Sequence, residues 1–334
     1  MPGLMLKSNW TIDKLKFSSR HLFLFVVLLT SIASVSANPA VEWIEKMSDS
    51  MRNLSYQGNF VYIHGKQLES MSILHIKDEY GEKERLLSLN GEAREVIRDN
   101  KNLTCIWPDS RKVVVDTSSQ NNFSPLFVPS DIAKISKYYG MSLADGDRVA
   151  GQDTIIVNIK PRDQFRYGLK LWINSGNGLL LKSNLINEQD QVVEQVMFTN
   201  LEVLSKNDQL QLITMPELDD SFSLIRYHSG DASGNLEADS TWQISELPEG
   251  FWQESALKRK VVGTDQFVQQ MVYTDGLASL SVFIEKETAQ TPQGETSLGA
   301  VNAFIRIFNS YSVTAIGEVP AITVRQVAES VYSQ

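Results

Sequence analysis

The stretch Phe123–Met141 reads FSPLFVPSDIAKISKYYGM and stands out as a helical pattern within a long run of strand patterns. Pro129 and the pair Ser130–Asp131 supply residues that open and cap a helix, and Gly140 supplies an end. An apolar stripe at helical spacing lies between these ends, formed by Ile132, Ile135, Tyr138 and Tyr139. The stripe predicts a helix of about 15 Å that must pack against another element.

The sequence on either side of this stretch has the period of β-strands. Tyr56–Asp116 before it and Thr154–Leu204 after it contain short runs rich in β-branched and aromatic residues. Asn90–Gly91 joins two of these runs as a tight hairpin turn would. We therefore expect about ten strands in a curved sheet, with the predicted helix in its concave face.

Several of the predicted strands are apolar on both faces. Phe60 and Tyr62 point to one side of their strand, whereas Val61 and Ile63 point to the other. An antiparallel strand with one face in water should alternate between apolar and polar residues. The doubled pattern favours a sheet that is covered on one face and lines an apolar groove on the other. An ordinary thick core explains the pattern equally well.

The first 37 residues have the pattern of a cleaved secretory signal. Four basic residues precede the apolar run Leu22–Leu29, and small residues follow up to Ala37. The apolar run is too short for a comfortable membrane span, so we expect cleavage after Ala37. Cys105 is the only cysteine, so no intramolecular disulfide can form. An exported chain without disulfides favours a bacterial periplasm.

The charge balance makes some partners poor candidates. The whole chain has a formal net charge of −9, and removal of four basic residues and Asp13 with the signal leaves 27 basic against 39 acidic residues. Nucleic acid is therefore not an expected partner, because its phosphates would be repelled.

The length of the mature chain and its mixture of strand and helix patterns predict an α+β protein with two domains. Residues 38–208 form the larger one, which opens with an amphipathic helix over Asn38–Leu54. Residues 209–234 contain scattered acidic residues, Pro216 and most of the Gly-, Ser-, Asp- and Asn-rich stretch HSGDASGN (228–235), and they predict a linker and an irregular entry into the second domain. Residues 235–334 form a smaller antiparallel β domain, with a hairpin turn at Asp275–Gly276 and a terminal helix over Pro320–Val331.

The sequence contains no pattern that indicates catalysis or a bound metal. The mature histidines are His64, His75 and His228, and no two of them lie at the spacing of metal ligands. There is no nucleophile elbow, phosphate loop or dinucleotide fingerprint. We therefore expect no cofactor, no metal and no enzyme activity. An apolar concavity joined to a second β module predicts a two-part binding protein.

Several longer segments resemble the RseB/MucB family. They are YQGNFVYIHG (56–65), LPEGF (Leu247–Phe251), VYTDGLASLSVFIE (Val272–Glu285) and IGEVPAITVRQVAESV (Ile316–Val331). The family comprises periplasmic regulators of the envelope stress sigma factor, sigma-E or AlgU. The resemblance implies that the larger domain is a LolA/LolB-like unclosed β-barrel with helices in its concave face, followed by the smaller β domain.

The resemblance also implies a function. Family members bind the periplasmic part of a membrane-anchored anti-sigma factor of the RseA/MucA type and shield it from a DegS-type protease. Lipid or lipopolysaccharide is thought to release that hold. For this chain the resemblance therefore implies an anti-sigma factor and a lipid as partners, and a homo-oligomer stays an open alternative.

Two sets of residues are candidates for these contacts. The expected lipid groove comprises Phe60, Tyr62, Leu126, Phe127, Ile132, Ile135, Tyr138, Tyr139 and Met141. The expected anti-sigma surface comprises Tyr273, Asp275, Gly276, Leu277, Ser279, Gly317, Glu318 and Pro320. Ordinary packing is the alternative for each of them, since a family motif marks the fold as readily as a contact.

Two other functions compete with the regulator. A periplasmic lipid or lipoprotein carrier of the LolA type would follow from the larger domain alone, but a carrier has no need of the second domain. A hydrolase with an unrecognised pair of carboxylates is the third alternative.

Overall fold

The computed structural model describes residues 38–100, 102–116, 132–205, 219, 221–227, 235–237, 241–260 and 266–334. The predicted signal, including Ala37, lies outside the described residues, so its cleavage stays a prediction. Leu126 and Phe127 of the expected groove also lie outside them. Within the described part of the chain, no helix has the length and hydropathy needed to cross a lipid bilayer.

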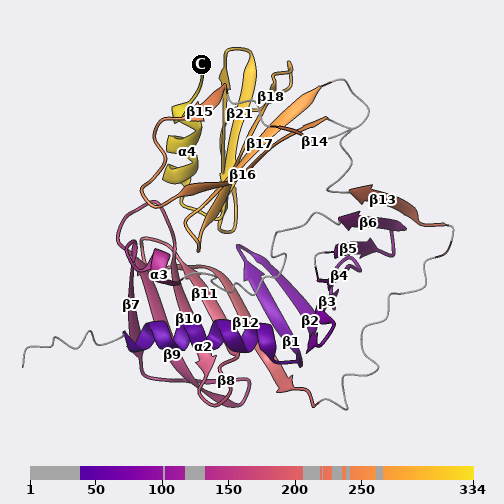
Figure 1. The fold of residues 1–334 in the computed structure, drawn as a ribbon, viewed down its shortest axis with the longest axis vertical. Helices are drawn as coiled ribbons and strands as arrows, with labels where there is room; N and C mark the ends of the chain where they lie inside the picture. The colour runs from indigo at the N-terminus through magenta and orange to yellow at the C-terminus, as the bar shows by residue number, and fades with distance from the viewer. Residues whose placement is uncertain are drawn as a thin grey trace, which may run out of the picture. The chain divides into compact units, whose positions relative to one another are not determined.

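The first described element is helix α2, Pro39–Asn53. Asn38 caps it, because its side-chain oxygen accepts a hydrogen bond of 3.0 Å from the Ala40 N–H. The residues on one stripe are fully or almost fully buried, namely Ala40, Ile44, Met47 and Met51. This helix confirms the prediction for Asn38–Leu54. It runs across the strands of the large sheet (Figure 1).

The large sheet contains thirteen strands among the described residues. In spatial order they are β13 (Ser223–Tyr227), β6 (Lys112–Asp116), β5 (Asn102–Trp107), β4 (Glu95–Asp99), β3 (Gly81–Ser88), β2 (Gln67–Asp78), β1 (Tyr56–His64), β12 (Val192–Val203), β11 (Leu180–Ile186), β10 (Gly168–Asn174), β9 (Gln152–Pro161) and β7 (Tyr139–Ala144), with β8 (Arg148–Val149) paired to β9. In this order β13 and β7 form opposite edges and do not pair with each other. The sheet is therefore unclosed, as expected.

The helix predicted for the stretch Phe123–Met141 is confirmed over only one turn of its described part and is wrong over the rest. Only Ile132–Ile135 is helical, as the single turn α3, and Tyr139–Met141 belongs to strand β7. Gly140 lies opposite Lys160 in the β7–β9 ladder and so does not end a helix. Pairing with β9 satisfies the backbone groups of this segment, and this tertiary gain outweighs the local helical pattern.

The predicted linker and irregular entry, residues 209–234, contain a strand in their described part. Strand β13, which falls within 209–234, pairs in parallel with β6 at the edge of the large sheet. Phe222 packs against Ile97, Ile106 and Val113 next to this strand. The apolar residues of SFSLIRY carry a strand pattern that the surrounding Gly, Ser and Asp residues obscured. The other domain boundaries stay predictions.

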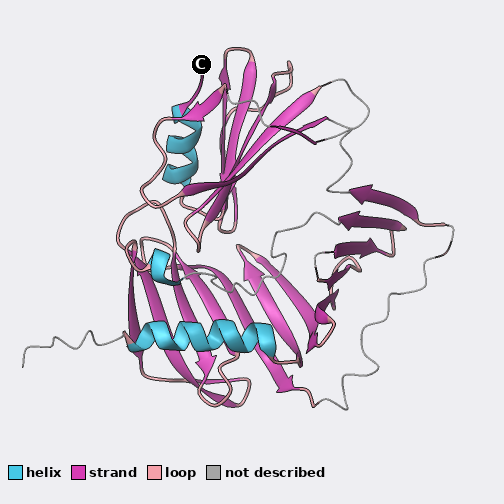
Figure 2. Ribbon diagram, in the orientation of Figure 1, coloured by secondary structure: helices cyan, strands magenta, loops and turns pink. Residues whose placement is uncertain are grey.

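The second sheet is antiparallel and smaller. Its described strands, in spatial order, are β14 (Asn235–Glu237), β16 (Trp252–Lys260), β17 (Phe267–Thr274), β18 (Ser279–Lys286), β21 (Tyr311–Gly317), β20 (Val301–Phe308) and β19 (Gly294–Leu298). Helix α4, Ala321–Ser330, packs on it, and a short pair is formed by β15 (Trp242–Ile244) and β22 (Val331–Ser333) (Figure 2). Val324, Val327 and Ala328 are fully buried. The terminal helix and the Asp275–Gly276 turn confirm the predictions.

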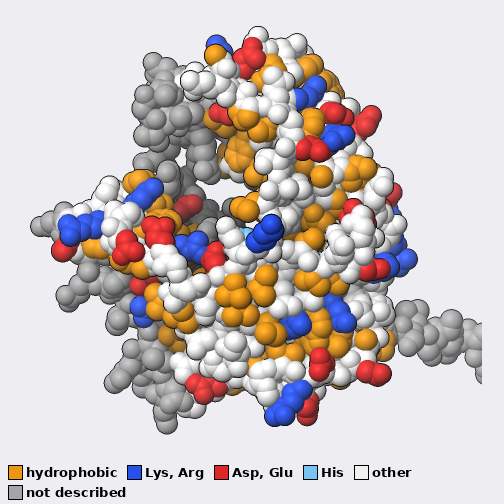
Figure 3. Space-filling view, turned by 180° about the vertical axis from the view of Figure 1, so that it is seen from behind, with side chains coloured by type: hydrophobic (Ala, Val, Ile, Leu, Met, Phe, Trp, Pro, Cys, Tyr) orange, Lys and Arg blue, Asp and Glu red, His pale blue; other side chains and the backbone are white. Residues whose placement is uncertain are grey.

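Basic side chains also lie against aromatic rings on the large sheet. The amino groups of Lys170 and Lys182 lie 5.0 and 4.5 Å from the centre of the Trp172 ring. Seen from behind, the surface shows hydrophobic side chains with Lys and Arg, and also Asp and Glu, among them (Figure 3). The Trp172 ring therefore lies between two lysine amino groups.

Candidate functional site at the junction of the two sheets

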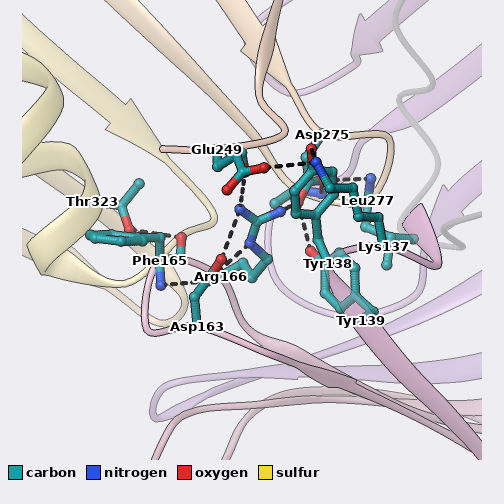
Figure 4. Close-up of polar contacts among 11 residues, drawn as sticks. Lys137, Tyr138, Tyr139, Asp163, Phe165, Arg166, Glu249, Asp275, Leu277 and Thr323 are labelled. Atoms are coloured by element: carbon teal, nitrogen blue, oxygen red, sulfur yellow. Dashed lines mark hydrogen bonds and ion pairs between the residues drawn. The ribbon is translucent and has the colours of Figure 1, made fainter. Parts of the chain in front are cut away.

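The loop between β9 and β10 contacts the second sheet. Residues Asp163–Tyr167 (DQFRY) lie in it, and Figure 4 shows Arg166 facing Glu249 and Asp275, which lie in loops next to strands of the second sheet. Asn38–Gln334 forms one compact unit, which includes both sheets. We refer to the contacts made by this loop and by Ile135–Tyr139 with the second sheet as the junction.

Arg166 is the centre of the junction. Its Nη1 atom lies 2.7 Å from Oδ2 of Asp275, its Nη2 donates to the backbone oxygen of Glu249 at 2.6 Å, and its Nε donates to Asp163 at 3.1 Å. The side chains of Arg166 and Asp275 are both 0% exposed. A buried ion pair offsets its desolvation cost only when other hydrogen bonds also hold its charges, and here Glu249 and Asp163 supply such partners for Arg166.

Aromatic rings surround the Arg166 guanidinium. Its central carbon lies 5.1 Å from the ring centre of Tyr138, 5.5 Å from that of Tyr139 and 5.0 Å from that of Phe251. Such rings attract a cation through their negative faces and exclude water from it. The charge of Arg166 is therefore shielded from solvent, and its attraction to Asp275 is stronger than it would be in water.

Each carboxylate oxygen of Asp275 accepts two hydrogen bonds. Its Oδ1 accepts from the backbone N–H groups of Leu277 and Ala278 at 2.8 and 2.7 Å. Its Oδ2 accepts from Arg166 and from the Tyr139 hydroxyl at 2.8 Å. Burial, and then the nearby Asp275 charge, raises the pKa of Tyr139 far above its ordinary value, so this hydroxyl remains a donor.

Two glycines allow the close approach of the two sheets. Gly250 has a φ of +91°, and a Cβ at this position would overlap the Tyr138 ring. Gly276 has a φ of +96°, and a Cβ there would lie 3.2 Å from a methyl carbon of Ile135. Any other residue at Gly250 would meet both backbone strain and a steric clash.

Further contacts extend the junction on both sides of Arg166. The Asn302 amide donates to the Tyr167 hydroxyl at 2.9 Å and to the backbone oxygen of Val319 at 2.8 Å. The Thr323 hydroxyl donates to the backbone oxygen of Phe165 at 2.7 Å. At the surface, Lys137 and Glu249 form an ion pair of 2.7 Å whose side chains are 67% and 76% exposed.

A third group of contacts involves strand β12. The Tyr62 hydroxyl donates to Glu194 at 3.0 Å, and the backbone N–H of Ala300, from the second sheet, donates to the same carboxylate at 3.3 Å. Tyr62 is thus held by a carboxylate that also contacts the second sheet. The junction therefore extends from the β9–β10 loop to the end of β1.

The structure places most of the expected groove residues in the core. Ile132, Ile135, Phe60 and Tyr139 are between 0 and 7% exposed, and they belong to the same cluster as the buried stripe of α2. Tyr62, Tyr138 and Met141 are half-buried against that cluster. Their arrangement brings Ile135, Tyr138 and Tyr139 to the junction. A role of these residues in lipid binding stays a prediction.

The expected anti-sigma residues also lie largely at or near the junction. Asp275 and Tyr273 are 1% and 5% exposed, and Leu277 packs against the core of the large sheet. Gly317 and Pro320 are partly or fully buried, whereas Ser279 and Glu318 are exposed. In this arrangement the turn Asp275–Leu277 contacts the large sheet: Asp275 is buried, and Gly276 and Leu277 are half-buried. Its role in partner binding stays a prediction.

Sequence reasoning missed Asp163, Arg166 and Tyr167. The available signal was an Arg flanked by aromatic residues, Phe165 and Tyr167, in a short loop between two strands. Arg166 and Asp275 are 109 positions apart, and sequence spacing alone could not pair them.

The chemistry of the junction is that of binding. The polar groups described above hold one another, and within the described residues no group of three or more His, Cys, Asp or Glu side chains could hold a metal ion. The arrangement can keep the two sheets docked through Arg166 and Asp275.

Comparison with known proteins assigns the family. Residues 39–217 match the model of the MucB/RseB N-terminal domain, and residues 236–332 match that of the MucB/RseB C-terminal domain. The sigma factor AlgU regulatory protein MucB of Pseudomonas aeruginosa is 30% identical over 320 residues, which cover 93% of this chain and 96% of MucB. The sigma-E factor regulatory protein RseB of Haemophilus influenzae is 24% identical and covers 95% of this chain and 98% of its own length.

A solved structure agrees with these matches. The crystal structure of MucB in complex with MucA(peri) is similar to this structure with a TM-score of 0.68 and 27% identity, covering 88% of this chain and 99% of the MucB chain. Because both of its domains match the family in order and a relative at 30% identity matches almost end to end, the chain belongs to the MucB/RseB family.

Proposed function

We propose that this chain is a periplasmic negative regulator of an extracytoplasmic stress sigma factor. It binds the periplasmic domain of a membrane-anchored anti-sigma factor of the RseA/MucA type. The observation that carries the proposal is the likeness, over 88% of this chain, to a MucB structure that contains the periplasmic part of MucA. The signal pattern that ends at Ala37 supports the periplasmic location.

Binding would shield the anti-sigma factor from a DegS-type protease, and lipid or lipopolysaccharide would relieve the shielding. Each methylene of an acyl chain that leaves water contributes about 0.8 kcal/mol, so part of one fatty chain could offset a coupling of a few kcal/mol between lipid and partner. The chain itself acts without catalysis in this proposal.

The expected lipid-groove residues are packed in the core of the large sheet, and this packing affects how a lipid could enter it. Phe60, Ile135 and Tyr139 are almost fully buried, and side chains of α2 pack in the same cluster. An acyl chain would therefore have to displace side chains that now fill the core. Such displacement is a change that the junction could sense, because Tyr139 also donates to Asp275.

A periplasmic lipid or lipoprotein carrier is the second candidate function. The unclosed sheet with a helix across it is compatible with a carrier. The second sheet favours the regulator, because it is docked by a dedicated set of contacts that carriage of a lipid does not require. A pull-down from a periplasmic fraction separates the two by asking whether the main partner is an anti-sigma factor or a lipoprotein.

The proposed function is tested by measuring the affinity of the mature chain for the periplasmic domain of the anti-sigma factor from the same organism. We expect tight binding that lipopolysaccharide weakens by tenfold or more, which corresponds to about 1.4 kcal/mol of coupling. An affinity that is unchanged by lipopolysaccharide would remove the lipid part of the proposal, and the absence of binding would remove the whole.

A further inference from the structure

Two buried polar atoms of the large sheet have no hydrogen-bond partner in the described part of the chain. They are Nε1 of Trp172 and Oδ1 of Asn184, and these residues are 5% and 7% exposed. A third such atom, Nε2 of His75, lies 3.3 Å from the Glu82 carboxylate. A buried donor or acceptor without a partner is unfavourable, and water, an ion or a ligand commonly supplies the partner. Trp172 and Asn184 therefore indicate a place where a bound group would complete the hydrogen bonding.

The strand register places two lysines beside these two residues. In the antiparallel ladder of β10 and β11, Trp172 lies opposite Lys182, and Lys170 lies opposite Asn184. Residues two apart in a strand share one face of the sheet, so the four residues lie at the corners of a square on the same face. We refer to Lys170, Trp172, Lys182 and Asn184 as the β10–β11 block.

The two lysines of the block carry positive charge that no acid neutralises within the described residues. Their amino groups lie 5.0 and 4.5 Å from the centre of the Trp172 ring, and none of the ion pairs formed there includes either of them. Lys160, on the neighbouring strand β9, lies by contrast 3.9 Å from Asp190. Two like charges on one ring repel each other, and an anion that contacts both removes this repulsion.

We infer that the β10–β11 block binds a phosphate-bearing anion. The two ammonium groups and the indole N–H are donors without acceptor capacity, and the Asn184 amide donates when its NH₂ group faces the ligand. A phosphate group offers several acceptor oxygens together with negative charge, and lysine binds it as a compact point charge.

The block is open to such a ligand. Both lysines are half-buried, so solvent reaches them, and the contacts that hold their amino groups on the ring are weak enough for them to turn toward an anion. The proposed function uses none of the four residues. The site and the regulator therefore stand or fall separately.

The site is tested by calorimetric titration of inorganic phosphate into the full mature chain at constant ionic strength. We expect saturable binding that is at least about tenfold weaker for Lys170→Met/Lys182→Met, which keeps the apolar stems and removes two charge-assisted hydrogen bonds. Lys160→Met/Lys286→Met is the matched control, because it lowers the net charge equally at exposed positions and should bind as the parent does. The melting temperature of each variant shows that it is folded.

The source of the phosphate is tested with vesicles of phosphatidylcholine with and without phosphatidic acid, whose head group is a phosphate. Saturable binding of inorganic phosphate assigns the site to a free anion. Binding only to the vesicles with phosphatidic acid assigns it to a lipid head group. Either result supports the inference when the block variant loses it and the control keeps it. Binding of neither probe, binding that the block variant retains, or an equal loss in the control overturns the inference.

Asn184→Leu separates a ligand site from a purely structural role. Leucine has a similar size and no polar atom to leave unpaired, so the melting temperature in phosphate-free buffer should equal or exceed that of the parent. The affinity for the bound probe should fall at least about threefold, because one donor is lost. Unchanged affinity overturns the assignment of Asn184 to the site. A lower melting temperature overturns the argument that its amide lacks a partner.

Discussion

At the scale of single residues, Glu82 and Glu84 on β3 show how position decides the effect of a charge. Both carboxylates contact Nη2 of Arg98, at 2.9 and 3.0 Å. The His75 ring, whose Nε2 lies 3.3 Å from Glu82, and then the Arg98 charge lower the pKa of Glu82. Burial raises the pKa of Glu84 in spite of Arg98. The same Arg98 side chain therefore contacts two carboxylates, of which Glu82 has a lowered pKa and Glu84 a raised pKa.

Glu82→Gln is expected to lower the free energy of unfolding by about 1 kcal/mol at pH 7, because it removes hydrogen bonds to a charged group. The pKa of Glu82 is lower in the folded state, so its contribution is present above the unfolded-state pKa and is lost as the pH falls through the folded-state pKa. Urea unfolding at pH 7 and at the lowest pH at which the chain stays folded measures the difference. An effect of equal size at both would contradict this account.

Glu84→Gln is expected to behave in the opposite way. The folded state disfavours the charged form of Glu84, so the parent chain loses stability as the pH rises through the range between the unfolded-state and folded-state pKa values. The neutral amide avoids that loss, so the variant should match or exceed the parent at pH 7. The same urea unfolding experiment measures the free energy of unfolding of Glu84→Gln. If this variant loses more of that free energy than Glu82→Gln does, the contact with Arg98 outweighs burial.

At the scale of elements, α2 anchors the core of the large sheet. Met47 is fully buried on its inner stripe, whereas Glu45 of the same helix is exposed. Met47→Ala should lower the free energy of unfolding by about 2–5 kcal/mol through lost contacts and the resulting cavity. Glu45→Ala should stay within about 0.5 kcal/mol of the parent. Thermal and urea unfolding check both, and similar losses for the two would contradict the assigned orientation of the helix.

The elements also show how far the sequence could predict the fold. The stripe of Ala40, Ile44, Met47 and Met51 was sufficient to predict α2, because a long amphipathic helix carries its own signal. The helical pattern of Ile132–Tyr139 was misleading, because the backbone of β7 is satisfied by β9, a partner that local spacing does not reveal. Strand β13 was missed for the same reason.

The candidate site could be predicted only in part. The motif around Asp275 drew attention to the turn, and the pattern around Tyr138 and Tyr139 drew attention to the segment that contacts it. Their joining through Arg166 depends on tertiary structure, because the three segments are separated by more than 20 residues in the sequence. The sequence thus indicated the Asp275 turn and the Tyr138–Tyr139 segment, but it did not indicate Arg166, which joins them.

At the scale of the whole molecule, the buried ion pair of Arg166 and Asp275 predicts that salt has little effect on the docking of the two sheets. The Debye length falls from about 10 Å at 0.1 M salt to about 3 Å at 1 M, which weakens exposed pairs such as Lys137–Glu249. Arg166 and Asp275 are 0% exposed and are not screened in this way. Small-angle scattering of the mature chain between 0.05 and 0.5 M salt should therefore give an unchanged radius of gyration. An increase with salt would show that exposed charges hold the junction.

The parallel pairing of β13 with β6 has a consequence for the tether between the two sheets. Only seven sequence positions separate Tyr227 of β13 from Asn235 of β14, a reach of at most about 27 Å. Without the pairing of β13, the chain between the two sheets would be counted from the end of β12 and would be roughly four times as long in sequence. Since the effective concentration of tethered groups falls as about the −3/2 power of tether length, this single strand raises the local concentration of one sheet at the other roughly eightfold. Release of β13 alone would therefore lower the probability of re-docking without altering any side chain of the junction.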